Sequence, residues 1–144
     1  MTRVLVVANE TVGADELLAE LMRLRDASGS TFYVIAPALA MDHGVGTWSQ
    51  AGAIEAAQER LNATLAILRG HGLEADGRVG DMHPIPAIGD ALREFPADRI
   101  VISTHPPARS RWLHRGDVVE KARKRFGLPV THVISHVPEH ASTG

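Results

Sequence analysis

Apolar residues along this chain fall into short runs that alternate with stretches of helical spacing. Val4–Ala8 and Arg99–Ser103 are largely continuous apolar runs, the pattern of parallel strands that are buried on both faces. Thr31–Ala36 and Val130–Ser135 predict two further strands of the same kind. Leu73–Val79 alternates only weakly and contains a glycine, which predicts an exposed edge strand. Five strands are therefore expected.

Four segments between these strands carry apolar residues at intervals of three or four, which predicts amphipathic helices. The first ends near Ser28-Gly29; the second begins at a capping box of Thr47 and Gln50 and ends at Gly70. The third starts near Pro84, and the fourth runs from about Gly116 to Arg125. The positions predicted to face inward are Leu17, Leu18, Leu21 and Leu24; Ile54, Ala57, Leu61, Leu65 and Leu68; Ile85, Ile88, Leu92 and Phe95; and Val118, Val119, Ala122 and Phe126.

The alternation of strand and helix predicts an α/β fold. We expect a five-stranded doubly wound parallel sheet between two layers of helices, a three-layer α/β/α arrangement. No linker, repeat or low-complexity tract interrupts the pattern, so residues 1–144 should form a single domain, with 136–144 as a flexible tail. Ligands in such folds bind beyond the carboxyl ends of the strands, where the strand order reverses.

Composition and charge narrow the range of functions. The absence of cysteine excludes disulfides and thiolate chemistry. No apolar run approaches the roughly 20 residues that cross a bilayer, and the first residues lack signal-peptide features, so a cytoplasmic protein without a membrane partner is expected. The net charge is −2, yet the segment from His105 to Phe126 holds seven Arg or Lys residues against Asp117 and Glu120. This basic segment predicts either an anionic partner or a solvated helix face.

The basic segment begins in a strand, loop and helix between Val101 and Asp117. That geometry directs backbone N–H groups and a helix N-terminus at whatever anion lies in the turn. Pro106 and Pro107 stand where glycines would let the backbone come close, and proline has no N–H to donate. Arginine side chains in the same loop could hold an anion instead, because the guanidinium fork binds phosphate well.

These features together resemble the universal stress proteins over essentially the whole chain. Nucleotide-binding members of that family carry Gly, two residues, Gly, nine residues, then Gly followed by Ser or Thr. Without gaps, these positions fall on Ser103, Pro106, Gly116 and Asp117, and only Gly116 matches. Asn9-Glu-Thr11 stands where the family usually has Asp-Gly-Ser. The resemblance implies an adenine nucleotide alpha hydrolase-like fold with a degenerate ATP motif, in which the Asp117 carboxylate would repel a triphosphate.

The resemblance therefore implies a non-catalytic stress-response or regulatory domain that does not bind ATP through the usual Gly-rich loop and has no cofactor. One alternative is that a nucleotide or another small anionic ligand binds in the crevice between strands 1 and 4 through the Arg-rich loop 104–116. Another is a nucleotide or phosphoester hydrolase that uses His105, although no Gly-x-Ser-x-Gly elbow is present. The residues predicted to bind any ligand are Asn9, Thr11, Thr104, His105, Arg109, Arg111 and Gly116.

The last strand predicts a partner. In the resembled family this strand lies at a sheet edge and often pairs with its copy, so the resemblance implies a homodimer through Pro129–Ser135, an apolar segment without charged residues. His132, His136 and His140 recur at intervals of four, but His132 lies in a predicted strand, and no metal site is expected. The basic segment lacks an aromatic-rich sheet motif or a recognition helix, which argues against nucleic acid.

Overall fold

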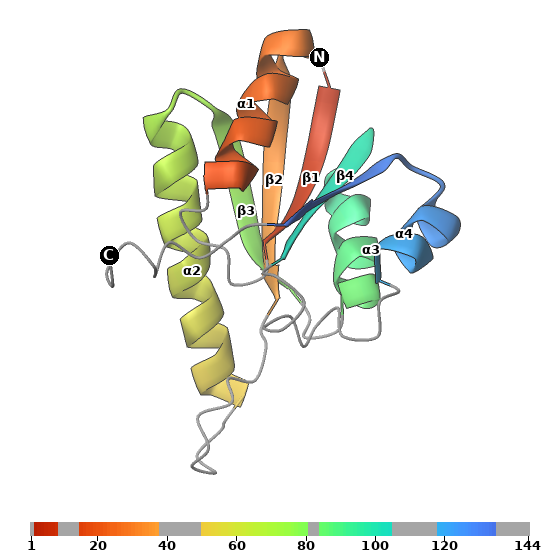
Figure 1. The fold of residues 1–144 in the computed structure, drawn as a ribbon. Coiled ribbons are helices and arrows are strands. Elements are labelled where there is room, and N and C mark those ends of the chain that lie inside the picture. The colour runs from red at the N-terminus through yellow and green to blue at the C-terminus, as the bar shows by residue number, and fades with distance from the viewer. Residues whose placement is uncertain (1, 9–14, 38–49, 81–83, 105–117, 135–144) are drawn as a thin grey trace.

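The computed structural model describes residues 2–8, 15–37, 50–80, 84–104 and 118–134 (Figure 1). Within these ranges strands and helices alternate along the chain. The strands are β1 (Thr2–Ala8), β2 (Ser30–Pro37), β3 (Glu74–Gly80), β4 (Arg99–Thr104) and β5 (Val130–Ile134). The helices are α1 (Asp15–Ser28), α2 (Gln50–Gly70), α3 (Pro84–Glu94) and α4 (Val118–Phe126).

All five strands run parallel in one sheet, in the order β3-β2-β1-β4-β5. β1 is the central strand, and its Val6 pairs with Val34 of β2 and Val101 of β4. Both faces of β1 are covered, which is why Val4–Ala8 is continuously apolar. The predicted five-stranded doubly wound parallel sheet is confirmed, as is the edge position of the strand that contains Gly77.

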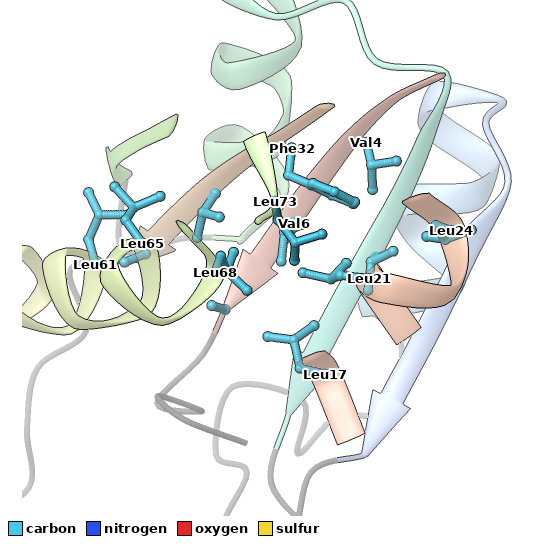
Figure 2. Packing of buried hydrophobic residues seen from close by; sticks show 14 of the residues in the cluster. Val4, Val6, Leu17, Leu21, Leu24, Phe32, Leu61, Leu65, Leu68 and Leu73 are labelled. Carbon is cyan, nitrogen blue, oxygen red and sulfur yellow. The ribbon is translucent and has the colours of Figure 1, made fainter. Parts of the chain in front are cut away.

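Each face of the sheet carries its own apolar core, because successive side chains of a strand point to opposite faces. Val4 and Val6 pack with the leucines of α1 and α2 on one face, where Figure 2 shows them around Phe32. Leu5 and Val7 pack with α3 and α4 on the other face. The three-layer arrangement therefore has α1 and α2 on one side and α3 and α4 on the other, as Figure 1 shows.

Glycines end the helices at the amino edge of the sheet. Gly29 follows α1 with a φ of 65° and donates its N–H to the carbonyl of Arg25 at 2.7 Å. Gly127 follows α4 with a φ of 64° and donates to the carbonyl of Arg123 at 3.0 Å. Both are left-handed helix caps, in which glycine avoids the steric cost of a Cβ. The short turns that result connect α1 to β2 and α4 to β5.

The inward face predicted for α2 is wrong at one position. Ala57, Leu61, Leu65 and Leu68 are buried as expected, but Ile54 is 44% exposed. The cause is length: the 21 residues of α2 span about 31 Å, whereas a strand of seven residues spans about 23 Å. The first turns of α2 therefore extend beyond the sheet, as Figure 1 shows for its yellow end.

The other helices agree with the predicted inward faces where their side chains are described. Val119, Ala122 and Phe126 of α4 pack in the second core, whereas the side chain of Val118 lies outside the described residues. The proposed capping box at Thr47 and the helix start at Gly116 also lie outside them. Among the described residues, no helix combines the length and the apolar character needed to cross a membrane.

Candidate functional site

The strand order reverses between β1 and β4. From β1 the chain proceeds outward to β2 and β3, then crosses to the other side of β1 for β4 and β5. β1 and β4 are hydrogen-bonded neighbours, and Ala8 lies opposite Ser103 at their carboxyl ends. The chain connections that follow two such strands run in opposite directions, and doubly wound folds bind their ligands at this point. The reversal therefore lies between the two strands for which the sequence predicts a crevice.

Of the predicted ligand-binding residues, Thr104 alone lies within the described part of the chain. It is the last residue of β4, and its backbone pairs with Ile134 of β5. It stays a prediction that the side chains of the predicted residues meet around a ligand. The predicted residues that lie outside the described ranges are Asn9, Thr11, His105, Arg109, Arg111 and Gly116.

Ser103 is the motif position that the structure describes most fully. It corresponds to the first glycine of the family motif, and its side chain is wholly buried within β4. Because strand residues alternate between faces, Ser103 shares a face with Val101, on the side of α1 and α2. A buried hydroxyl side chain thus stands near the end of β4.

The amino ends of the helices follow the carboxyl ends of the strands along the chain. α1 begins at Asp15 after β1 ends at Ala8, and α4 begins at Val118 after β4 ends at Thr104. The first turn of a helix has N–H groups without partners in the helix and carries the positive end of the helix dipole. This end of α1 and of α4 therefore favours a negative charge near the reversal point. In α3 the first residue is Pro84, which supplies no N–H.

Sequence patterns did not predict the polar cluster formed by Tyr33, Arg78 and Glu94. The Tyr33 hydroxyl donates to Glu94 Oε1 at 3.2 Å, and Arg78 Nη1 donates to Glu94 Oε2 at 2.5 Å. The partners come from β2, β3 and the end of α3, so no local motif could reveal them. Phe95, predicted as the last inward position of the third helix, follows α3 and stacks on the Tyr33 ring with centroids 5.1 Å apart.

The electrostatics of this cluster point to a structural role. Burial, followed by the hydrogen bond to Glu94, raises the pKa of the Tyr33 hydroxyl. The hydrogen bonds from Arg78 and then from Tyr33 lower the pKa of the Glu94 carboxyl. Both shifts keep the groups in their usual neutral-pH states, a protonated hydroxyl and a charged carboxylate. The cluster therefore joins two strands to α3 and is not tuned to exchange protons near pH 7.

His132 is the histidine of the predicted series that the structure describes. Its side chain is exposed on β5, although desolvation of part of the ring, with a smaller effect from the charge of Arg123, lowers its pKa. His136 and His140 lie outside the described residues. Within the described ranges, no group of three His, Asp or Glu residues is placed to hold a metal ion. The lowered pKa favours the uncharged form of the His132 ring.

A concave region that the sequence did not predict lies between α3 and α4, apart from the β1–β4 reversal. Its lining includes Gly89 on α3 and Phe126 at the end of α4. Gly89 interrupts the apolar face of a predicted helix, and the residues before Phe126 are basic, but neither signal alone identifies a groove. Only the packing of α3 beside α4 brings the two together.

Comparison with known proteins was made on sequence and on structure. No protein family model matches the sequence, and no curated protein matches it. Solved structures do match the fold. A universal stress protein from Archaeoglobus fulgidus superposes with a TM-score of 0.62 and 22% identity, over 92% of this chain and 98% of that chain.

Two further solved structures give the same result. The universal stress protein from Archaeoglobus fulgidus in complex with dAMP superposes with a TM-score of 0.61 and 20% identity, over 92% of this chain and 99% of that chain. A protein from the universal stress protein family of Burkholderia pseudomallei superposes with a TM-score of 0.63 and 17% identity, over 91% and 94% of the two chains. At these identities the likeness establishes the fold. This chain has the universal stress protein fold.

Proposed function

We propose that this protein is a non-catalytic stress-response or regulatory domain of the universal stress protein type that works as a homodimer. The observation that carries the proposal is the sheet itself. Its strand order reverses between β1 and β4, the kind of point where doubly wound folds bind ligands, and leaves β5 at an edge, in a fold shared with universal stress proteins.

The dimer contact is proposed at the outer edge of β5. The carbonyl of Pro129 accepts the N–H of Ile100 at 2.9 Å and therefore faces β4. Since N–H and C=O groups alternate in direction along a strand, those of His132 face away from β4. Among the described residues no strand pairs with that side, where Arg123 Nη2 donates to the outward carbonyl of Val130 at 3.1 Å. Open strand edges of this kind are usually covered or blunted by charge, and a second copy of β5 would cover this one.

Replacing His132 by proline is expected to convert the dimer into a monomer. Proline removes the outward N–H, while the bonds to β4 come from the neighbouring residues and remain. Light scattering at micromolar concentration should then give the mass of one 15.5 kDa chain for His132→Pro and twice that mass for the wild type. His132→Gln keeps the N–H and should remain dimeric. A wild-type mass of one chain would refute the proposed dimer.

The crevice is not expected to hold ATP through the usual glycine-rich loop. Pro106 and Pro107 cannot donate N–H groups, and Asp117 places a carboxylate where a hydroxyl would assist a nucleotide. The buried Ser103 side chain occupies the position of the first motif glycine. These substitutions remove the close backbone approach on which the usual loop depends.

A second candidate function is the binding of a nucleoside monophosphate or another small anion by the Arg-rich loop 104–116. The observation that favours it is the Archaeoglobus fulgidus universal stress protein, which has this fold and was solved in complex with dAMP. In this chain Arg109 and Arg111 would bind the phosphate, and Asn9 and Thr11 would contact the base or ribose. Arginine supplies fork-shaped donors to phosphate without any need for glycine.

AMP or dAMP is expected to raise the melting temperature of the wild type with saturation, whereas millimolar ATP should not. Arg109→Ala and Arg111→Ala should each weaken binding of the monophosphate by about tenfold, because each removes a charge-assisted phosphate contact. Arg23→Ala is the matched control, since Arg23 is an exposed cation on α1 that pairs with Glu20. The measurement is a thermal-shift titration, combined with mass analysis of small molecules released from the purified protein.

Each outcome separates the candidates. A saturating shift with ATP would show that the Arg-rich loop replaces the glycines and would contradict the loss of ATP binding. No shift with the monophosphates would remove the second candidate and leave the dimeric domain. If the wild type turned over a nucleotide and His105→Ala did not, both candidate functions would be wrong, and the protein would be a hydrolase that uses His105.

A further inference from the structure

A groove of about 540 Å³ runs between α3 and α4, on the opposite side of the sheet from α1 and α2. Its apolar lining includes Ile85, Leu92 and Phe126, and charged side chains of both helices also line it. The combination of an apolar floor and a charged rim is the usual composition of a protein interaction site. The groove lies apart from the reversal point between β1 and β4, so its role is independent of any ligand there.

Gly89 produces the hollow in the groove. A Cβ at this position would lie 3.7 Å from Phe126 Cε1 and 3.8 Å from Cζ, which is ordinary contact. A Cβ at Gly89 would therefore touch only the edge of the Phe126 ring, which forms one wall of the groove. An aliphatic or aromatic side chain from another molecule can enter there and meet apolar surface, the arrangement that makes a buried anchor effective.

The charged residues that line the groove are Asp90, Arg93 and Arg125, which together carry one excess positive charge. Arg125 lines it, and Lys121 and Lys124 are exposed on the same helix; none of the three forms an ion pair with a described residue. Arg123 differs, because it donates to Glu120 Oε2 at 2.5 Å. On the α3 side, Arg93 is largely offset by Asp90 at 3.2 Å. α4 therefore keeps an excess of positive charge that a partner can neutralise.

We propose that the groove between α3 and α4 docks an acidic amphipathic segment of a partner protein. Its apolar anchor packs beside Gly89 and Phe126, and its carboxylates face Arg125 at the rim of the groove. Helix-in-groove recognition has these two parts, apolar anchors at helical spacing and charges that fix the register. The positive charge also speeds the encounter with an acidic partner.

The shape of the site favours a protein segment over a membrane or a nucleic acid. A flat bilayer does not fill a concave groove, and the apolar floor around Phe126 would stay empty against it. A nucleic acid would need aromatic faces for stacking along its phosphate track, whereas Phe126 stands with its ring edge toward Gly89. An acidic amphipathic peptide can place apolar side chains against the floor of the groove and carboxylates against its charged rim.

The test uses the full chain and a synthetic amphipathic helix of about 16 residues, with Leu and Phe on one face and Glu on the other. Fluorescence anisotropy measures its binding at low and high salt. The wild type should bind this peptide with an affinity that falls as salt rises, and should not bind the same peptide with Lys in place of Glu. Arg125→Glu should weaken binding by about tenfold.

Matched substitutions distinguish binding in the groove from non-specific electrostatic attraction. Arg23→Glu makes the same charge change at an exposed position on α1, across the sheet, and should leave the affinity unchanged. Gly89→Leu fills the hollow without adding charge and should abolish binding, whereas Gly89→Ala adds one methyl group and should have little effect. Circular dichroism confirms that each variant is folded, which helix-favouring replacements of a helical glycine should allow.

Four outcomes would overturn the proposal. Absence of wild-type binding is the first, and equal weakening by Arg125→Glu and Arg23→Glu is the second. The third is binding to vesicles of anionic lipid, or to random RNA, in place of the peptide. The fourth is a change in the protein's own oligomeric mass in Gly89→Leu, which would show that a second copy of the chain occupies the groove.

Discussion

Gly77→Ala is expected to lower the free energy of unfolding by about 3 kcal/mol, the upper part of the usual cost of overpacking a core. A Cβ at Gly77 would lie 2.3 Å from the backbone oxygen of Val34 and 2.9 Å from Leu61 Cδ1. The Leu61 side chain can rotate, but the oxygen belongs to β2, the strand that pairs with β3. Strand β3 must therefore shift before a methyl group fits.

The local structure explains why the strands come so close at this point. The backbone N–H of Gly77 donates to Asp76 Oδ1 at 2.9 Å, so a side chain competes with the strand ladder beside the glycine. Glycine within a strand often marks such a close approach of two backbones. The cost of alanine therefore arises from geometry, because a methyl group in open space on an edge strand would cost little.

Urea unfolding at one fixed protein concentration measures the effect, since the stability of a dimer depends on concentration. Gly89→Ala is the matched control. It makes the same chemical change in the interior of α3, where the Cβ meets only ordinary contacts, and should stabilise the protein by about 0.5–1 kcal/mol. If Gly77→Ala were as stable as the wild type, the close approach of β3 to β2 would be wrong.

The elements were predictable because each has a local cause. The run Val4–Ala8 lies in the centre of the sheet, where both faces are apolar, and its short, continuous apolar pattern identifies it. The order of the strands has no such signal. Periodicity gives the sequence of elements, whereas the position of β4 beside β1 depends on contacts between distant residues. The resemblance implied only that the last strand lies at an edge and that a crevice lies between strands 1 and 4.

Two features of the fold escaped prediction for physical reasons. Ile54 continues the helical spacing of the buried residues, but helical spacing does not tell where the sheet beneath the helix ends. The contact of Tyr33 with Glu94 joins residues 61 positions apart, so no pattern along the chain brings them together.

The candidate site was less predictable than the fold. Its predicted residues lie almost entirely in the segments that follow β1 and β4, where no periodic pattern constrains the backbone. Ser103, the first position of the motif overlay, lies near the end of β4, but the overlay cannot tell what the Arg-rich loop binds. A shared fold hosts several functions, and the side chains decide between them.

Phe32→Ala is expected to destabilise the protein by about 3–5 kcal/mol, the usual cost of deleting a large buried aromatic side chain. Phe32 is 2% exposed and is the largest fully buried side chain among the described residues. Figure 2 shows it among Val4, Val6 and Leu73, within the core between the sheet and the helices α1 and α2. Removal of the ring leaves a cavity that the strands cannot close.

Phe95→Ala is the matched comparison, because the same atoms are removed from the opposite side of the sheet. The Phe95 ring is only half-buried and stacks on Tyr33, so its loss should cost about 2 kcal/mol less than the loss of Phe32. Phe32→Leu keeps most of the apolar volume and should cost about 1 kcal/mol. Equal losses in Phe32→Ala and Phe95→Ala, measured in the same urea titrations, would contradict the assignment of Phe32 to a closed core. In a closed core, the volume left by a deleted side chain is filled neither by solvent nor by movement of a neighbouring helix.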